Sequence, residues 1–290
     1  EPLTFYLVPF FLHCVYLINL LMSPHRSAIF WIFLLTIIWT CTRPPYADTN
    51  RAYKQQARGF GKSLMQFPLE DSFETAADWV GTTNFSMRKP NYVIIHHTAQ
   101  DSTGQTLRTF TLPRTKVSAH YVIGRDGAVY HMLHDLLRAH HAGISKWGNT
   151  TDLNSCSIGI ELDNNGSEPF SEAQINSLIA VLDKLQKAHG VPTPNFIGHA
   201  DIAPGRKVDP SRYFPWEKLA KAGYGIWYDT TSSKPPADLN LVQGLRIIGY
   251  NTTNERNAIQ SYRIHFTPND TTRQLHEGDR KIIWDLMKKS

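Results

Sequence analysis

Residues 198–210 constrain the chain most, because a turn rich in proline and glycine separates a histidine from an aspartate there. His199 and Asp209 are ligand types that zinc accepts, and such a turn can bring both onto one ion. A second histidine, His96, follows the apolar run at residues 92–95. Two histidines and one carboxylate leave a fourth position for water, as in catalytic zinc sites. We therefore predict a metal site at His96, His199 and Asp209.

Two apolar runs, residues 92–95 and 157–162, predict central strands buried on both faces. His96 would emerge at the end of the first strand, where a rigid backbone can hold a ligand in place. Glu161 interrupts the second run. Because burying an unpaired carboxylate costs several kcal/mol, Glu161 is expected either to be functional or to form a structural ion pair.

The remaining local signals predict a hairpin and a long helix. Residues 118–123 and 128–133 are strand-like and are joined by Gly-Arg-Asp-Gly, a typical hairpin turn. A helix is predicted after Ser171, which would form a capping box with Gln174, and it should end at Gly190. Its single apolar stripe predicts packing on the sheet. A shorter helix is expected at about residues 106–112.

Five segments, in the same order, resemble the zinc-dependent N-acetylmuramoyl-L-alanine amidases of the amidase-2 group, to which the peptidoglycan recognition proteins are related. They are residues 93–99, 118–123, 141–147, 157–164 and 198–210. The resemblance implies an α/β fold with a mixed central β-sheet flanked by helices. It also implies one Zn²⁺ per catalytic domain, held by the three predicted ligands.

The same resemblance implies roles for further residues. Glu161 would be the general base, and Lys207 would stabilise the oxyanion, with a salt bridge to a nearby carboxylate as its alternative. Tyr121 would lie near the zinc and take part in catalysis, unless it is simply packed in its strand. His141 would line the cleft and bind substrate, and Trp147 would stack on a sugar or cover the pocket.

The implied reaction is hydrolysis of the amide between N-acetylmuramic acid and L-alanine in peptidoglycan or muropeptides. The rival function is non-catalytic peptidoglycan binding on the same fold, and the complete ligand set argues against it. The net charge of +5 is weakly in keeping with an anionic partner such as a wall polymer or a lipid surface. No nucleic-acid partner is expected, and the protein is expected to be a monomer.

The sequence before residue 91 predicts export, and the sequence after residue 227 predicts a second module. Residues 1–41 are apolar and resemble a lipoprotein signal that starts at Met22 and ends at a lipidated Cys41; the alternative is a pair of membrane segments. Such a protein would reside in the periplasm of a Gram-negative bacterium, anchored to the outer membrane.

The predicted domain boundaries follow from composition and the resemblance. An irregular tether is expected at residues 42–90, the catalytic domain at 91–227 and a linker at 228–236. A three-helix module resembling peptidoglycan-binding modules would occupy residues 237–290. The alternative for this last part is a helical buttress on the catalytic domain.

Overall fold

The computed structural model describes residues 44–65, 84, 86–231 and 234–290. The chain divides into two compact units, Glu1–Gly81 and Thr82–Ser290, which are considered separately. The predicted leader at residues 1–41 lies outside the described residues. Within the described part of the chain, no helix has both the length and the apolar content needed to cross a membrane.

The described part of the first unit contains the helix α3 (Ala47–Met65). None of its residues is buried. The predicted irregular tether therefore contains a regular helix, which the sequence analysis missed. Alanine, lysine, arginine and glutamine favour helices and are frequent here, and no proline lies within residues 47–65.

The second unit is built on a five-stranded sheet with the order β3-β2-β4-β1-β5. The strands are β1 (Tyr92–His97), β2 (Tyr121–Ile123), β3 (Val129–His131), β4 (Ser157–Leu162) and β5 (Phe196–Gly198). Only the β2–β3 hairpin is antiparallel; β4 pairs in parallel with β1 and β2, and β5 with β1. The mixed sheet expected from the sequence is thus confirmed.

Both faces of the sheet are covered. Helix α6 (Glu172–His189) packs on one face, where Val93 and Ile95 of β1 join its buried Leu178 and Leu182. Ile94 points to the opposite face and meets Ile202 of the short helix α7 (His199–Ile202). The uninterrupted apolar run in β1 follows from this arrangement, because a strand covered on both faces has no solvent-facing positions.

The predicted helices form, with one difference in capping. The Ser171 hydroxyl accepts a hydrogen bond from the Gln174 backbone N–H (3.1 Å), and Gly190 ends α6 with φ of +65°. The Gln174 side chain does not return to Ser171; it donates to the carbonyl oxygens of Ile123 and Asp163 (3.0 and 3.1 Å). The capping box is therefore half formed, because the bonds from the amide NH₂ group to the sheet carbonyls hold the side chain away from the Ser171 N–H.

The other helices of this region are α4 (Thr103–Thr111), α5 (Leu153–Cys156) and α8 (Trp216–Lys221), with 3-10 turns at Pro113–Thr115 and Thr193–Asn195.

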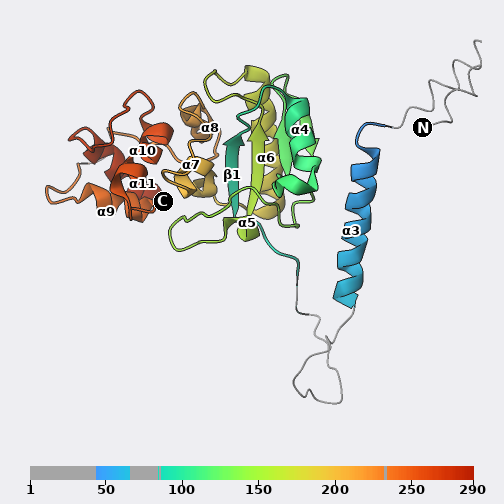
Figure 1. Cartoon of the computed structure of the whole chain (residues 1–290). Coiled ribbons are helices and arrows are strands. Elements are labelled where there is room, and N and C mark those ends of the chain that lie inside the picture. The colour runs from blue at the N-terminus through green and yellow to red at the C-terminus, as the bar shows by residue number, and fades with distance from the viewer. Residues whose placement is uncertain (1–43, 66–83, 85, 232–233) are drawn as a thin grey trace, which may run out of the picture. The chain divides into compact units, whose positions relative to one another are not determined.

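Three further helices follow: α9 (Leu241–Ile248), α10 (Glu255–Phe266) and α11 (Asp279–Lys289). They share an apolar core that includes Leu245, Tyr262 and Ile283, and Trp147 and Trp227 of the preceding region pack against it. Figure 1 shows these helices beside α7, which lies between them and β1. We call residues 237–290 the C-terminal module.

Candidate metal centre

Strand ends bring two histidines together. His96 lies near the C-terminal end of β1, and His199 directly follows β5, the parallel neighbour of β1. Because parallel strands end at the same edge of a sheet, residues that are 103 apart in the sequence meet there. The loop after α7 then returns Asp209 to the same point.

The three side chains converge on one point. His96 Nδ1 lies 2.9 Å from His199 Nδ1 and 3.0 Å from Asp209 Oδ2, and His199 Nδ1 lies 2.9 Å from the same oxygen. All three residues are buried. They form the one group of three or more potential metal-binding side chains found among the described residues. The structure therefore brings the three predicted ligands together.

The second nitrogen of each imidazole fixes its ring. His199 Nε2 donates to the carbonyl oxygen of Ala142 (3.1 Å), and His96 Nε2 contacts His141 Nδ1 (3.0 Å). Both rings thus present Nδ1 to the shared point, as metal-binding histidines do when the other nitrogen is engaged.

The protonation states of His96 and Asp209 suit a cation. Burial, assisted by His199, lowers the pKa of His96 to about 4, so that its ring is neutral at pH 7. Burial alone would raise the pKa of Asp209, but hydrogen bonds from His199 and His96 hold it below its usual value. Two imidazole nitrogens and one carboxylate oxygen are a donor set that fits Zn²⁺.

Glu161 lies beside this group. It pairs in register with His96 across β1 and β4, and its Oε1 is 3.9 Å from His96 Nδ1. Its Oε2 is buried and has no hydrogen-bond partner among the described residues. Burial and the charge of Asp209 raise its pKa to about 8, against the opposing effect of Lys207. In the described part of the chain, Glu161 has no ion pair with a lysine or arginine, and its contact with His96 is long for an ion pair.

Lys207 is half-buried on the loop between two ligands. Its backbone N–H donates to the Ala203 carbonyl oxygen (3.0 Å). Its positive charge acts on Glu161 and on His96. In the described residues, its ammonium group makes no ion pair with a carboxylate, so the salt bridge considered as its alternative role is absent from them.

The structure places His141 behind His96, and not on the surface of a cleft. The ring is buried, with Nδ1 facing His96 Nε2 and Nε2 lying 3.2 Å from the Ser157 hydroxyl. Gly159 makes this possible, since a Cβ at that position would lie 2.4 Å from the His141 ring. His141 therefore orients His96, which differs from the expected contact with substrate.

Tyr121 lies on the opposite face of the sheet from the metal ligands. It pairs with Ile160 and shares the α6-side core with it, whereas Glu161 points to the other face. Its hydroxyl donates to Asp135 (2.8 Å) and its ring stacks on His131 at 4.4 Å. The expected position near the metal is thus not observed, and the alternative of a packed tyrosine agrees with the structure.

Trp147 faces the C-terminal module. Its ring lies 5.0 Å from that of Tyr250, and it contacts Gly249 so closely that a Cβ there would lie 2.3 Å away. The structure therefore gives Trp147 a contact between two parts of the unit. This differs from the expected place over a sugar.

Arg206 is a site residue that the sequence analysis missed. Its guanidinium donates to the carbonyl oxygens of Ala142 (2.7 Å) and Ile144 (3.0 and 2.7 Å). These bonds connect the loop before Asp209 to the carbonyl that also binds His199. Its place beside Lys207 is the only sequence signal, and nothing local indicates partners 62 and 64 residues away.

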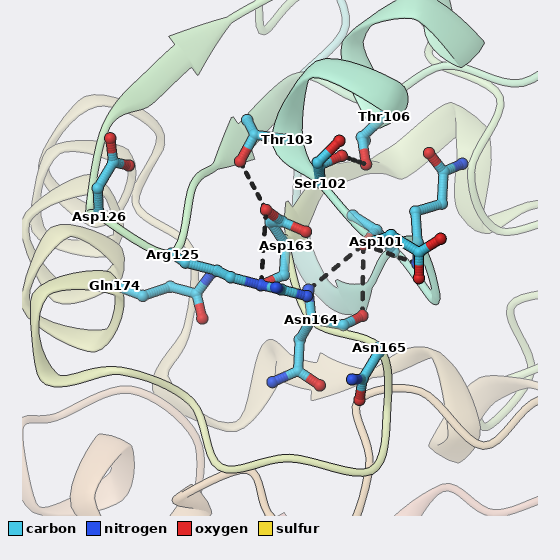
Figure 2. Close-up of polar contacts among 12 residues, drawn as sticks. Asp101, Ser102, Thr103, Thr106, Arg125, Asp126, Asp163, Asn164, Asn165 and Gln174 are labelled. Atoms are coloured by element: carbon cyan, nitrogen blue, oxygen red, sulfur yellow. Dashed lines mark hydrogen bonds and ion pairs between the residues drawn. The ribbon is translucent and has the colours of Figure 1, made fainter.

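A polar cluster holds the chain that follows Glu161 (Figure 2). Asp163 accepts a hydrogen bond from the Thr103 hydroxyl (2.6 Å), and Arg125 lies 3.7 Å from the same carboxylate. The Asn164 carbonyl oxygen accepts from the Ala99 N–H (3.0 Å). These contacts fix the end of β4 and therefore the position of Glu161.

Known proteins resemble this chain in sequence and in fold. Residues 86–212 match the family described as N-acetylmuramoyl-L-alanine amidase, amidase-2. The chain is 32% identical over 208 residues to the N-acetylmuramoyl-L-alanine amidase AmiD of Escherichia coli K12, covering 61% of this chain and 74% of AmiD. It is also 38% identical over 104 residues to the 1,6-anhydro-N-acetylmuramyl-L-alanine amidase AmpD of Haemophilus influenzae, covering 36% of this chain and 56% of that protein.

Solved structures agree with the sequence relatives. The complex of E. coli AmiD with the substrate anhydro-N-acetylmuramic acid-L-Ala-D-gamma-Glu-L-Lys matches with a TM-score of 0.63 and 29% identity, over 72% of this chain and 93% of that chain. AmpDh3 of Pseudomonas aeruginosa, in complex with anhydromuramic pentapeptide, matches with a TM-score of 0.62 and 26% identity, over 76% and 99% of the two chains. The chain therefore belongs to the amidase-2 family of N-acetylmuramoyl-L-alanine amidases, and it is an enzyme.

Proposed function

We propose that this amidase depends on zinc, held by His96, His199 and Asp209, and that Glu161 and Lys207 act on the scissile amide. The convergence of three buried donor atoms beside Glu161 is the observation that carries this proposal. When bound, zinc supplies Lewis-acid chemistry, polarising a carbonyl and making water more acidic.

Glu161 is suited to move the proton. Without metal, burial and Asp209 raise the pKa of Glu161 to about 8; the charge of a bound cation would favour its ionised form, which can take a proton from the attacking water. The water oxygen forms a new bond to the carbonyl carbon of the lactyl group. The bond to the L-alanine nitrogen then breaks, and Glu161 returns the proton to the departing amine. Lys207, whose charge acts on Glu161 and His96, would stabilise the negative charge that develops on the carbonyl oxygen.

The proposed substrates are peptidoglycan fragments that carry the muramic acid to L-alanine amide. AmiD and AmpDh3 were crystallised with anhydromuramic peptides, which makes anhydro-muropeptides the first compounds to test. The rival function, peptidoglycan binding without hydrolysis, does not require a general base. A buried Glu161 beside a complete ligand set therefore favours hydrolysis.

The test uses residues 42–290 with muropeptides and purified sacculi, and resolves the products by mass. Chelation should abolish release of the peptide, and added zinc should restore it, because a buried site of this kind acts only when loaded. Elemental analysis should find one zinc per chain. Activity that survives prolonged chelation, in protein without detectable metal, would contradict the zinc mechanism. Binding of muropeptides without cleavage by the zinc-loaded protein would favour the rival function.

We also propose that the protein is exported and anchored to the outer membrane through Cys41. The support is the apolar leader with basic residues after Met22 and a cysteine at its end. Expressed in a Gram-negative host, Cys41→Ser should release the protein into the soluble periplasmic fraction or leave it uncleaved in the inner membrane. Unchanged size and unchanged outer-membrane fractionation would contradict lipidation at this residue.

A further inference from the structure

One face of α10 follows the segment that carries two predicted metal ligands. Asn257, Ser261 and His265 are four residues apart from one to the next, so they lie along one side of the helix. Each of them contacts the segment between His199 and Asp209. We propose that the C-terminal module positions the metal ligands of the amidase, in addition to any contact it makes with the cell wall.

Asp201 is the central residue of this contact. It lies in α7, two residues after His199, and is 1% exposed. Its Oδ1 accepts a hydrogen bond from the Tyr250 hydroxyl (2.8 Å), and its Oδ2 accepts from His265 Nδ1 (2.8 Å) and from the Gly198 backbone N–H (2.7 Å). One carboxylate thus joins two side chains of the C-terminal module to the backbone that precedes His199.

His265 is itself held in one orientation. Its ring stacks on Trp216 with a centroid distance of 3.8 Å, and Trp216 in turn packs against Gly198. His265 Nε2 is buried and has no hydrogen-bond partner among the described residues. Since a carboxylate can only accept, the Nδ1 atom carries the hydrogen that bonds Asp201.

Two more contacts extend along the same face. The Ser261 hydroxyl donates to the Ala200 carbonyl oxygen (2.7 Å), in the turn that bears His199. Asn257 fills the space beside Gly205, where a Cβ would lie 2.1 Å from its amide nitrogen. Gly205 belongs to the loop that leads to Lys207 and Asp209. The contacts therefore reach both the start and the middle of the ligand segment.

The local sequence cannot fix this segment by itself. Helix α7 has four residues, far fewer than a helix needs to be stable alone. A metal ligand must nevertheless stay within about half an ångström of its working position. The hydrogen bonds from the C-terminal module supply that restraint. This inference rests on the proposed zinc site, and its test therefore begins with the zinc affinity of the wild-type protein.

Two buried tyrosines of the C-terminal module provide a matched test. The Tyr250 hydroxyl bonds Asp201, whereas the Tyr262 hydroxyl bonds Asp279 within the module (3.0 Å). Both rings are almost fully buried. Tyr250→Phe and Tyr262→Phe each remove one hydroxyl that is bonded to a buried aspartate, but only the first affects the segment of His199.

The measurements are the zinc dissociation constant, by competition with a colorimetric chelator, the melting temperature, and kcat at saturating zinc. We expect Tyr250→Phe to raise the dissociation constant roughly tenfold, as loss of a group that orients a ligand does. Tyr262→Phe should lower the melting temperature by about as much as Tyr250→Phe does, and it should leave the zinc dissociation constant unchanged. His265→Leu should weaken zinc binding further, and His265→Asn, which keeps a donor near Nδ1, should recover part of the loss.

The outcomes separate the two proposals. Wild-type protein that binds no zinc would overturn the proposed zinc mechanism and this inference with it. If the wild type binds zinc, a wild-type zinc affinity in Tyr250→Phe would overturn the positioning role alone. An equal loss of zinc affinity in both tyrosine variants would also overturn it, because general loosening of the module would then explain the effect.

Discussion

Glu161 is buried, and one of its carboxylate oxygens has no hydrogen-bond partner among the described residues. Glu161→Gln keeps the shape of the side chain and removes the base. We expect kcat to fall by roughly 10²–10⁴ while zinc content stays near that of the wild type. Glu217→Gln, at an exposed position, is the control and should change neither quantity. If zinc is lost in step with activity, Glu161 supports the ligands and is not the base.

Lys207 tests the stabilisation of developing charge. An ammonium that acts on the transition state contributes little to ground-state binding, so Lys207→Ala should lower kcat and kcat/KM together by roughly 10²–10³. The exposed Lys146 offers a control, since Lys146→Ala removes the same charge from a nearby loop. Near-normal kcat at saturating zinc, with weakened zinc binding, would instead show that Lys207 holds the ligand loop.

His120 makes stability depend on pH. Gly159 N–H donates to its Nδ1 (3.0 Å) and its Nε2 donates to the Leu137 carbonyl oxygen (2.9 Å), so the buried ring is neutral. Burial, assisted by Arg88, lowers its pKa from 6.5 to about 4. The unfolded chain therefore binds this proton first as the pH falls. His120 should contribute its full stability above pH 6.5 and lose it progressively down to about pH 4, a change of about 3 kcal/mol.

The check compares unfolding free energies across that range. His120→Gln cannot titrate, so the difference between wild type and variant should change between pH 6.5 and 4. His140→Gln, at an exposed position, should follow the wild-type curve. A constant difference between wild type and His120→Gln would contradict a neutral buried imidazole.

A site residue could be predicted where a strand end or a motif places its side chain, and not where a distant partner does. His96, Glu161 and His199 follow from strand ends and a known motif. For Tyr121 the sequence left two positions open, near the metal or packed in its strand, because successive residues of a strand point to opposite sides and the motif does not say which side faces the metal. His141 and Arg206 depend on partners that are 45 and about 60 residues away, which no local pattern encodes.

At the level of elements, boundaries were predictable where capping chemistry marks them. Helix α6 starts after Ser171 and ends at Gly190, as expected. Ser171→Ala should lower the unfolding free energy by about 1 kcal/mol, because the Gln174 N–H loses its acceptor. Ser171→Thr keeps the hydroxyl, which also donates to the Arg125 carbonyl oxygen, and should retain most of the stability. Equal denaturant midpoints for Ser171→Ala and the wild type would show that the cap contributes nothing.

Helix α3 shows where local signals mislead. Two glycines, Gly59 and Gly61, and the prolines before Ala47 suggested irregular structure. Each glycine costs roughly 1 kcal/mol in a helix, but a 19-residue segment with many good helix formers can offset that cost. Because no residue of this helix is buried, its sequence carries no apolar stripe that would predict a helix.

At the scale of the whole molecule, the packing between the predicted domains is the feature that is hardest to predict from the sequence. The sequence suggested a linker at residues 228–236, followed by either a binding module or a helical buttress; in the structure, Thr82–Ser290 form one compact unit. The contacts that join the two parts, such as Trp147 with Tyr250, pair residues about 100 apart in the sequence. These contacts are ordinary core packing, and no sequence motif predicts them.

Removing the C-terminal module tests this unity. Without residues 232–290, Trp147 and Trp227 would lose the apolar core against which they pack, and Asp201 would lose two of its three hydrogen-bond donors. A carboxylate that loses most of its hydrogen-bond donors and newly exposed aromatic rings both destabilise a fold. We therefore expect residues 82–231 to melt about 6–12 °C below residues 82–290, since a loss of about 3 kcal/mol shifts a domain of this size by roughly that amount. Thermal unfolding of residues 82–290 should also be a single transition. Two separate transitions, with the first part melting at the same temperature whether or not the module is present, would instead indicate independent domains joined by a linker.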